Sequence, residues 1–374
     1  MEQNLTFAEL GLSKEILQAL EQKGYGYPTR IQAEAIPPFM QWKDVIAKAP
    51  TGTGKTFAFG IPMLEHIDAG SEDLQGLVLA PTRELAIQIC DELKGLAAFN
   101  KDIRVAVVYG GAKIEQQIKQ LAKHPQIVVA TPGRLMDHYN RKTLRLDKVQ
   151  TVVLDEADRM LDMGFIADIR RLLPLLPVRR QTLLFSATMP RDIVALSGSV
   201  LCDPVRVEVT PASSTVDRVD QRVYFVERPE KKSLLVSVLR KQADKSVLVF
   251  SRTKHGADNI ARMLKRAGIR SEAIHGNKSQ GQRQRALGDF KSGKVKVMVA
   301  TDIAARGIDV SELHTVINYD LPDAAETYVH RIGRTGRAGH SGVALTFCSQ
   351  DEHAKVRDIQ KLTGRKLETV SCTA

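Results

Sequence analysis

Three acidic residues follow a short apolar run in the first half of the chain. Thr151 to Leu154 are β-branched or aliphatic, which predicts a buried parallel strand, and Asp155, Glu156 and Asp158 come directly after it. In an open α/β sheet, chemistry takes place just beyond the carboxyl ends of the strands. Carboxylates in such a place are costly unless they serve a metal ion or a water molecule. The alternative is a solvated turn whose acids favour the dipole of a following helix.

A glycine-rich loop earlier in the chain favours the metal-site interpretation. Val45 to Ala47 predict a strand, and a loop that opens a helix follows it, Thr51-Gly52-Thr53-Gly54-Lys55-Thr56. Glycines let backbone N–H groups close around phosphate oxygens, Lys55 can reach the β- and γ-phosphates, and the Thr56 hydroxyl can ligate Mg²⁺. Ala49 stands where the usual pattern has its first glycine, so the match is incomplete.

The two stretches together predict one nucleotide site, with ATP and Mg²⁺ as its cofactors. Asp155 and Thr56 are the predicted metal ligands, and Glu156 would orient or deprotonate the water that attacks the γ-phosphate. Lys55, Asp155 and Glu156 are therefore the predicted catalytic residues of this half.

Length and composition are typical of a globular protein of two domains. The chain has 374 residues, of which 43% are hydrophobic and 26% are charged, so core material is ample. No apolar run is long enough to span a bilayer, and the N-terminus lacks a basic-then-apolar signal, so we expect a cytoplasmic protein. The cysteines have no metal-ligand spacing and are expected to be free thiols: Cys90, Cys202, Cys348 and Cys372.

The net charge of +11 indicates a polyanionic partner. Aromatic residues make up only 5% of the chain and do not cluster, which argues against base-stacking platforms. The composition therefore favours contacts to the sugar-phosphate backbone, which are independent of sequence.

Apolar strands alternate with helical patterns in both halves, which predicts βαβ units and parallel sheets. After the glycine-rich loop, the predicted strands of the first half are 77–80, 105–109, 127–130, 151–154 and 182–185. Those of the second half are 223–226, 247–250, 270–274, 295–299, 315–319 and 343–347. Near the N-terminus, Leu12, Ile16, Leu17 and Leu20 fall at helical spacing behind Ser13, a candidate N-cap.

The predicted domain boundary lies between these two series of strands. The stretch from Val207 to Gln221 loses the helical pattern and gathers Pro, Ser and Thr, so we expect an exposed linker there. The expected organisation is domain 1 at 1–208, linker at 209–217 and domain 2 at 218–374. The second half has no glycine-lysine phosphate loop, so it must serve the nucleotide site of the first.

The tetrad Asp155-Glu156-Ala157-Asp158, together with the glycine-rich loop, resembles the DEAD-box family of ATP-dependent RNA helicases. Its continuation, RMLDMGF, resembles the bacterial RhlE-like branch. The resemblance runs from about residue 5 to about residue 360, with the motifs in family order. It implies two tandem RecA-like domains, each a parallel sheet flanked by helices, joined by a flexible linker.

The same resemblance extends to the N-terminal stretch GYGYPTRIQ, which is similar to the family's adenine-reading motif. It implies that Gln32 hydrogen-bonds the adenine edge and that Tyr25 stacks on the ring, with Phe7 packing nearby. Ordinary core packing is the alternative for Tyr25 and Phe7. Arg30 replaces a proline of the family pattern.

Polar clusters at the strand ends of the first half match the family's RNA-contacting motifs, although each could be an ordinary turn. The residues implied as RNA contacts are Thr82, Arg83, Gly111, Thr131, Gly133 and Arg134. In the second half, the resemblance implies RNA contacts for Gln280, Arg283, Thr301 and Arg306, and a contact of Asp309 with the ATP ribose. A solvated basic helix face is the alternative for Gln280 and Arg283.

The octet HRIGRTGR, residues 330–337, intersperses three arginines and a histidine with glycines and is poor helix material. An arginine supplied across an interface stabilises charge on the transferring phosphoryl group and can be worth roughly 10³–10⁵ in rate. By the resemblance, Arg334 and Arg337 are such arginine fingers, and His330 and Arg331 couple them to the contacts between the domains.

Ser186 and Thr188 follow a predicted strand, and by the resemblance they link hydrolysis to strand separation through hydrogen bonds with Asp158. Capping of the next helix is the alternative.

The expected activity is that of an ATP-dependent RNA helicase, in which RNA-stimulated ATP hydrolysis drives cleft closure and local, non-processive unwinding of RNA duplexes. A DNA-directed translocase and an ATP-gated RNA clamp with little unwinding stay open as alternatives. The expected partner is RNA, with little sequence specificity and no membrane, and a monomer is the default. No long basic or glycine-rich tail follows the second domain, so any target choice made by such a tail is expected to lie outside these residues.

Overall fold

The computed structural model describes residues 5–50, 52–209, 219–305, 313–336 and 341–371. The chain divides into two compact units, 1–210 and 211–374. Four of the predicted site residues lie outside the described ranges, namely Thr51, Arg306, Asp309 and Arg337. The expected linker lies outside them as well, apart from Val209, and its limits stay a prediction.

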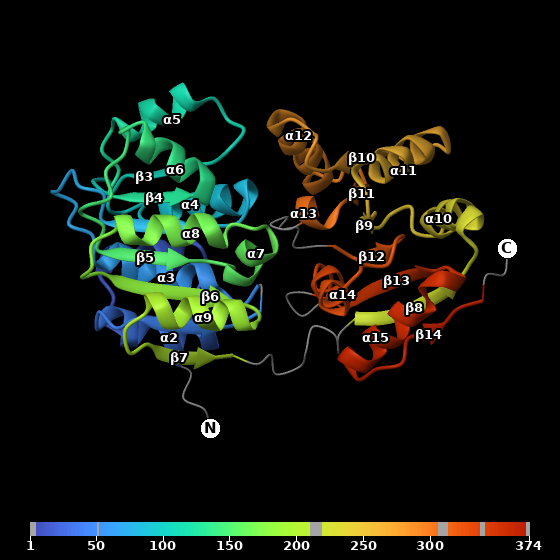
Figure 1. The fold of residues 1–374 in the computed structure, drawn as a ribbon, viewed down its shortest axis with the longest axis horizontal. Coiled ribbons are helices and arrows are strands. Elements are labelled where there is room, and N and C mark those ends of the chain that lie inside the picture. The colour runs from blue at the N-terminus through green and yellow to red at the C-terminus, as the bar shows by residue number, and fades with distance from the viewer. Residues whose placement is uncertain (1–4, 51, 210–218, 306–312, 337–340, 372–374) are drawn as a thin grey trace. The chain divides into compact units, whose positions relative to one another are not determined.

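The first unit is built on a seven-stranded parallel sheet with the order β3-β4-β2-β5-β6-β1-β7. The strands are β1 (Val45–Lys48), β2 (Gly76–Leu79), β3 (Val105–Val108), β4 (Ile127–Ala130), β5 (Thr151–Leu154), β6 (Gln181–Ser186) and β7 (Val205–Glu208). The central strands are apolar on both faces because helices cover both, as expected for a parallel sheet (Figure 1).

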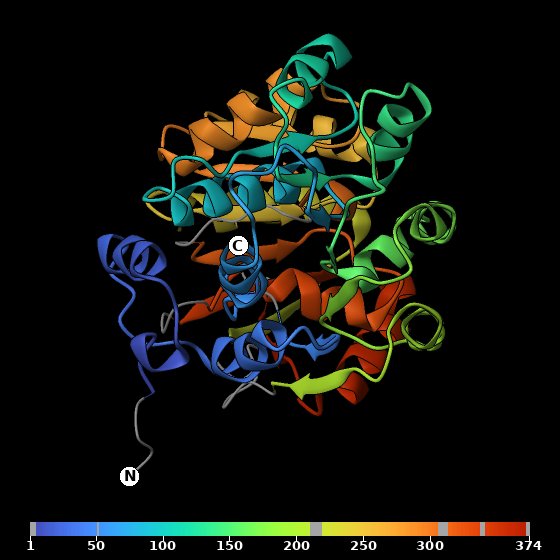
Figure 2. The same cartoon turned by 90° about the vertical axis from the view of Figure 1, so that its left-hand side faces the viewer.

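The helices of the first unit form two layers, one on each face of the sheet. One layer contains η1 (Ala8–Leu10), α1 (Lys14–Gln22), α2 (Arg30–Met40), α3 (Lys55–Glu65) and α4 (Arg83–Leu96). The other contains α5 (Ile114–Leu121), α6 (Pro132–Asn140), α7 (Ala157–Asp162), α8 (Ile166–Leu172), η2 (Leu173–Leu175) and α9 (Arg191–Val200). Figure 2 shows the blue N-terminal helices on one side of the strands and the green helices on the other.

The second unit repeats this plan with the strand order β10-β11-β9-β12-β13-β8-β14, again parallel throughout. Its strands are β8 (Val219–Phe225), β9 (Val247–Phe250), β10 (Ser271–Ile274), β11 (Val297–Ala300), β12 (Thr315–Asn318), β13 (Gly342–Cys348) and β14 (Glu368–Thr369).

Two layers of helices cover this sheet too. One face carries α10 (Lys231–Arg240) and α11 (Lys254–Arg266), preceded by η4 (Arg228–Glu230). The other carries α12 (Gln280–Lys291), α13 (Asp302–Ala305), α14 (Ala325–Ile332) and α15 (His353–Thr363), the last preceded by η5 (Gln350–Glu352). The prediction of two parallel sheets flanked by helices is therefore confirmed.

The predicted strands are all present, and the predicted N-cap of α1 is confirmed because the Ser13 hydroxyl accepts a hydrogen bond from the Ile16 N–H. The exposed stretch predicted from Val207 to Gln221 is wrong at both ends. Val207 lies in β7 and pairs with Ala47, while Gln221 lies in β8. Edge strand β7 alternates buried and exposed residues over only four positions, which is a weak pattern next to a proline-serine cluster.

Across the described ranges, no helix is long and apolar enough to cross a membrane. Cys90 and Cys348 are buried free thiols, and Cys202 is an exposed one. Cys372 lies outside the described residues.

A buried carboxylate fastens three segments of the first unit. Asp44, just before β1, accepts hydrogen bonds from the backbone N–H groups of Thr182 in β6 and Cys202 before β7, both at 2.7 Å. The carboxylate therefore ties the start of β1 to β6 and to the segment before β7.

We predict that Asp44→Ala lowers the free energy of unfolding of the first unit by about 2–4 kcal/mol, because the buried N–H of Thr182 and the partly buried N–H of Cys202 lose their charged acceptor. Urea denaturation would measure the loss, with the exposed Asp102→Ala as the matched control. Equal stability of the two variants would contradict this role for Asp44.

Candidate nucleotide and RNA site

Most predicted site residues of the first unit lie at the carboxyl edge of its sheet. The glycine-rich loop follows β1, the acidic residues follow β5, and Ser186 and Thr188 lie at the end of β6. The predicted RNA contacts follow β2, β3 and β4. The strand order therefore divides this edge into a nucleotide half and an RNA half, which meet where β5 pairs with β2.

The glycine-rich loop connects the end of β1 to the start of α3. Gly52 and Gly54 have φ angles of 83° and 92°, a left-handed conformation that favours glycine, and Gly54 is the N-cap of α3. The Lys55 side chain is buried, and its Nζ donates to the Ala49 carbonyl at 3.0 Å. Thr56 follows it, half-buried in the first turn of α3.

Ala49, which replaces the first glycine of the usual pattern, continues the strand pairing of β1. It is fully buried, and its N–H extends the pairing of β1 by donating to the Ser186 carbonyl at 2.9 Å. The first position of the pattern therefore continues the strand here, and the left-handed turns fall on Gly52 and Gly54 instead.

Helix α2 is fastened to the glycine-rich loop by two polar side chains at its start. The Gln32 amide nitrogen donates to the Gly54 carbonyl at 3.1 Å, and its oxygen accepts from the Thr29 N–H at 2.8 Å. The Thr29 hydroxyl donates to the Thr53 carbonyl at 2.8 Å. A Cβ at position 54 would collide with the Gln32 amide, so glycine is required there for a second reason. Adenine reading by Gln32 stays a prediction.

The two aromatic residues of the predicted adenine site have different surroundings. Phe7 is buried in the core, as the core-packing alternative holds. Tyr25 is 51% exposed, and its ring packs edge-to-face with that of Phe57, with the ring centroids 5.2 Å apart. An exposed aromatic ring suits stacking on a base, and that role of Tyr25 stays a prediction.

The acidic residues after β5 are almost completely buried. Asp155 is 2% exposed, and its Oδ1 accepts from the Glu156 N–H at 3.0 Å. Burial raises the pKa of Asp155 to about 7; Lys55 opposes this shift and the neighbouring Glu156 adds to it. Glu156 adopts a left-handed backbone with a φ of 53° at the start of α7.

Arg159 supplies the countercharge of Glu156. Its side chain is buried, and Nη1 forms an ion pair with the Glu156 Oε2 one helical turn away. An ion pair removed from water to this degree is costly to break from one side only.

The predicted hydrogen bonds between Asp158 and the end of β6 are present. Asp158 Oδ2 accepts from the Thr188 N–H at 2.8 Å and from its hydroxyl at 2.9 Å. The Ser186 hydroxyl accepts from the Asp158 N–H at 3.2 Å and donates to the Thr188 carbonyl at 2.7 Å. These bonds join the ends of β5 and β6, while the coupling role of the three residues stays a prediction.

Helix starts and glycines form the RNA half of the edge. Thr82 is the N-cap of α4, and its hydroxyl accepts from the Leu85 N–H at 3.2 Å. The guanidinium of Arg83 lies over Gly111, whose φ of 86° and lack of a side chain both allow this approach. A Cβ at position 111 would overlap the guanidinium.

The next two strand ends complete this half. The Thr131 hydroxyl accepts from the Gly110 N–H at 3.4 Å, and Arg134 Nη1 donates to the Ala112 carbonyl at 3.2 Å. Gly133, in the first turn of α6, is exposed with open space beside it. The sheet thus brings all six predicted RNA contacts of this unit to adjacent strand ends, and RNA binding by them stays a prediction.

Arg331 makes several polar contacts within the second unit. Its buried guanidinium pairs with both carboxylate oxygens of Asp302, at 2.6 and 2.8 Å. It also donates to Asn318 Oδ1 and to the Asp320 carbonyl, and it lies 4.8 Å from the centre of the Phe250 ring. These contacts join α13, α14 and β12 within the unit, and coupling between the units stays a prediction.

The other predicted residues of this unit lie at helix starts or ends. Thr301 is buried after β11, and its carbonyl accepts from the Ala304 and Ala305 N–H groups. Gln280 begins α12, with Arg283 in its first turn. Arg334 is buried just after α14.

The prediction that the octet 330–337 is poor helix material is wrong for its first residues. His330, half-buried, and Arg331 form the last turn of α14, and the helix ends at Gly333. Tertiary bonds of Arg331 stabilise that turn, which local propensity alone does not favour.

Comparison with known proteins agrees with this geometry. Residues 29–196 match the family model for the DEAD/DEAH box helicase, and residues 230–339 match that for the helicase conserved C-terminal domain. The chain is 50% identical over 365 residues to the DEAD-box ATP-dependent RNA helicase CshA of Geobacillus kaustophilus, covering 97% of this chain and 78% of that relative. This chain belongs to the DEAD-box helicase family. CshA of Bacillus cereus is 47% identical over 363 residues, covering 97% and 69%.

Solved DEAD-box structures share the fold of both units. S. cerevisiae Dbp5 bound to RNA and ADP BeF3 is similar with a TM-score of 0.87 and 31% identity, covering 98% of this chain and 95% of that one. Mss116p bound to single-stranded RNA and AMP-PNP gives a TM-score of 0.90 and 29% identity, covering 100% and 80%. The two sheets with their helices are the tandem RecA-like domains of this family.

Three residues of this DEAD-box chain that support the site were not selected from the sequence. Thr29 fastens the glycine-rich loop, Arg159 pairs with Glu156, and Asp302 holds Arg331. Arg159 could have been found from its spacing of three residues from Glu156 across a helix start. Asp302 carries no such local signal, because its partner lies 29 residues away.

We predict that the free energy of unfolding of this chain falls as pH rises from about 4 to about 7, because Asp155 has a raised pKa in the folded state. The folded state keeps the Asp155 proton until about pH 7, whereas an unfolded chain loses it near pH 4. The folded state therefore binds more protons in this window, and the stability due to this group falls by up to about 1.4 kcal/mol per pH unit.

Urea denaturation of wild type and Asp155→Asn across this window would measure the effect, since the variant lacks the titrating group. As pH rises, the free energy of unfolding of wild type should fall relative to that of the variant. A pH-independent difference, like that expected for the exposed Asp192→Asn, would contradict the raised pKa.

We predict that Arg159→Ala lowers the free energy of unfolding by about 3–5 kcal/mol, because it leaves the Glu156 carboxylate buried without its countercharge. Arg159→Lys should lose less. Adding Glu156→Gln to Arg159→Ala should restore part of the loss, which a double-mutant cycle in urea would reveal. Additive effects, or a loss no larger than that of the exposed Arg191→Ala, would exclude the pairing.

Proposed function

We propose that this chain opens short RNA duplexes locally and non-processively, using ATP to control closure of its two RecA-like domains. Family membership and 50% identity to CshA make it an ATP-dependent RNA helicase, and hence an ATP hydrolase. The observation that carries the proposal is the shared carboxyl edge of the first sheet. There the nucleotide residues and the predicted RNA contacts meet on the paired strands β5 and β2.

Mg²⁺ is the metal that we propose for the nucleotide site, held by Asp155 and Thr56. Magnesium is usually bound through one or two carboxylates together with substrate phosphates. In keeping with this, the described part of the chain has no group of three His, Cys, Asp or Glu side chains that could hold a metal alone. When bound, the ion would neutralise charge on the β- and γ-phosphate oxygens.

The side chains of this chain then have distinct proposed roles. Lys55 would exchange its bond to the Ala49 carbonyl for a phosphate oxygen, and Glu156 would orient the attacking water. Arg334 and Arg337 would act as arginine fingers from the second domain. Adenine and ribose would be read by three further residues, Gln32, Tyr25 and Asp309.

RNA is the proposed partner, bound through its backbone with little sequence specificity. Helix starts and glycines at the ends of β2, β3 and β4 support this, because they offer backbone N–H groups and guanidinium groups to phosphates. The solved relatives Dbp5 and Mss116p are bound to RNA. A DNA-directed translocase and an ATP-gated RNA clamp are the competing functions.

Three finer assignments also belong to the proposal. RMLDMGF favours the RhlE-like branch, although the curated relatives described above carry the name CshA. We place the protein in the cytoplasm, and we propose that it acts as a monomer.

We predict that single-stranded RNA strongly stimulates steady-state ATP hydrolysis by the wild-type chain, whereas matched DNA does not. Lys55→Ala should lose nucleotide binding or turnover. Glu156→Gln should keep nucleotide binding but lose roughly 10²–10⁴-fold in turnover, because it removes the base that orients water.

Equal stimulation by DNA would favour the translocase, and full turnover by either variant would exclude the nucleotide site as assigned. Displacement of a short RNA strand under multiple turnover separates a helicase from a clamp, because a clamp would bind RNA with ATP yet release no strand.

A further inference from the structure

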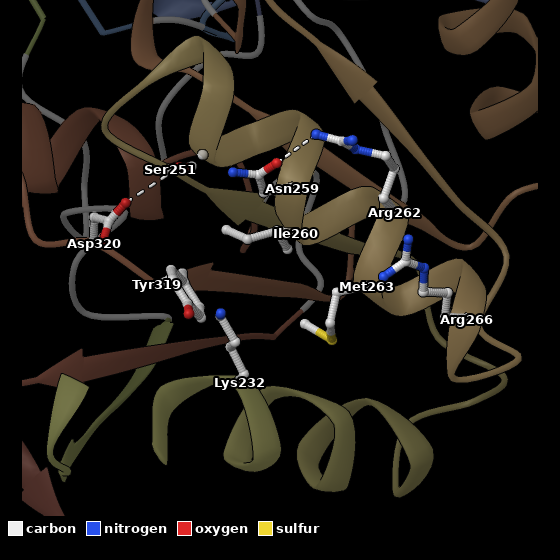
Figure 3. A pocket seen from close by; sticks show the side chains of 10 residues that line it. Lys232, Ser251, Asn259, Ile260, Arg262, Met263, Arg266, Tyr319 and Asp320 are labelled. Carbon is white, nitrogen blue, oxygen red and sulfur yellow. Dashed lines mark hydrogen bonds between the residues drawn. The ribbon is translucent and has the colours of Figure 1, made fainter. Parts of the chain in front are cut away.

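A pocket of about 520 Å³ opens on the second unit between helices α10 and α11 (Figure 3). Helix α11 contributes a stripe of residues at spacings of three and four, namely Gly256, Asn259, Ile260, Met263 and Arg266, with Arg262 beside it. Lys232 at the start of α10 faces this stripe, and Ser251, Tyr319 and Asp320 close the end nearest the strands. None of these residues belongs to the nucleotide or RNA sites assigned above.

Three cations of the pocket have no acidic partner. Lys232, Arg262 and Arg266 are all exposed, and no carboxylate within the described ranges lies at ion-pair distance from any of them. Arg262 instead donates to the side-chain oxygen of Asn259 (Figure 3). Three like charges that converge on one hollow without compensation favour a negatively charged ligand.

The single acid of the pocket is already satisfied. Asp320 Oδ2 accepts from the Arg252 N–H at 2.9 Å and from the Ser251 hydroxyl at 3.2 Å. Asp320 thus lies beside β9 and β12, Arg262 and Arg266 lie toward the C-terminus of α11, and Lys232 lies beside Tyr319 (Figure 3).

Apolar side chains form the wall between these charged groups. Ile260 is 5% exposed, and Met263 and Tyr319 are half-buried against the core of this face. Methionine and tyrosine, together with arginine, are enriched where protein surfaces bind one another. Burial raises the pKa of Tyr319 to about 12, so its hydroxyl is neutral and can donate a hydrogen bond.

The position of the pocket argues for a peptide and against an extension of the RNA path. Alternate strand residues pack α10 and α11 on one face of the sheet, whereas α12 and α13 lie on the other. The predicted RNA contacts Gln280 and Arg283 belong to α12, on that other face.

We propose that this pocket docks an acidic peptide segment of a partner protein, with an apolar side chain against Ile260 and Met263 and carboxylates against Arg262, Arg266 and Lys232. The three cations favour an acidic partner, and the apolar wall between them favours a peptide with an apolar side chain among its acids. None of the pocket residues is among those assigned to the nucleotide or RNA sites, so we expect peptide binding to be independent of ATP turnover.

The test uses the full chain and a fluorescein-labelled synthetic peptide in which Asp and Glu alternate with Ser around one central Phe. Fluorescence anisotropy should show binding that weakens with added salt. A peptide with Asn and Gln in place of Asp and Glu should not bind, and one with Ser in place of Phe should bind more weakly. Arg262→Glu combined with Arg266→Glu should weaken binding about tenfold or more.

Arg357→Glu combined with Lys361→Glu makes the same change in net charge at exposed positions of α15, so this double variant is the matched control and should bind like wild type. RNA-stimulated ATP hydrolysis of the α11 double variant should equal that of wild type, which shows that it is folded and active. Equal binding of the acidic and amide peptides would overturn the proposal, as would unchanged binding by the α11 double variant. Loss of RNA affinity in the α11 double variant would overturn it too and assign the pocket to RNA.

Discussion

The burial of three charged side chains at the end of β5 is the constraint on which the nucleotide site depends. Asp155 and Glu156 are nearly inaccessible to water, and Arg159 is buried with them. Carboxylates in such a place are costly, and the local fold compensates one of them with Arg159 and the other with a backbone N–H and the nearby Lys55. In the function proposed above, the same Asp155 carboxylate would also ligate a bound Mg²⁺.

Hydrogen bonds join the ends of β5 and β6 beside these buried side chains. Asp158, on the helix that carries Arg159, accepts two hydrogen bonds from Thr188. The Ser186 hydroxyl accepts from the Asp158 N–H and donates to the Thr188 carbonyl. The main chain of Ser186 in turn accepts from Ala49 at the start of the glycine-rich loop. The acids, the phosphate loop and the end of β6 therefore form one bonded unit, in which a shift at any member alters the others.

The sequence predicted those features whose cause is local. Runs of β-branched residues such as Thr151 to Leu154 predict buried strands, and the glycines of the phosphate loop occupy left-handed positions. Edge strand β7 was missed because its alternation spans four residues, and the helical turn at Arg331 was missed because distant bonds to Asp302 and Asn318 stabilise it. The bond of Gln32 to the Gly54 carbonyl likewise joins residues that no local pattern relates.

The bond from Gln32 to the Gly54 carbonyl also places this amide directly against the glycine-rich loop. Both polar atoms of the Gln32 side chain are already in use, one by the loop that would hold phosphates and one by the start of its own helix. Each atom keeps further capacity, because the amide nitrogen carries a second N–H and the oxygen a second lone pair. A group that bonds to this amide could therefore do so while Gln32 stays tied to Gly54 and Thr29, so the same side chain that positions the loop can also meet a ligand.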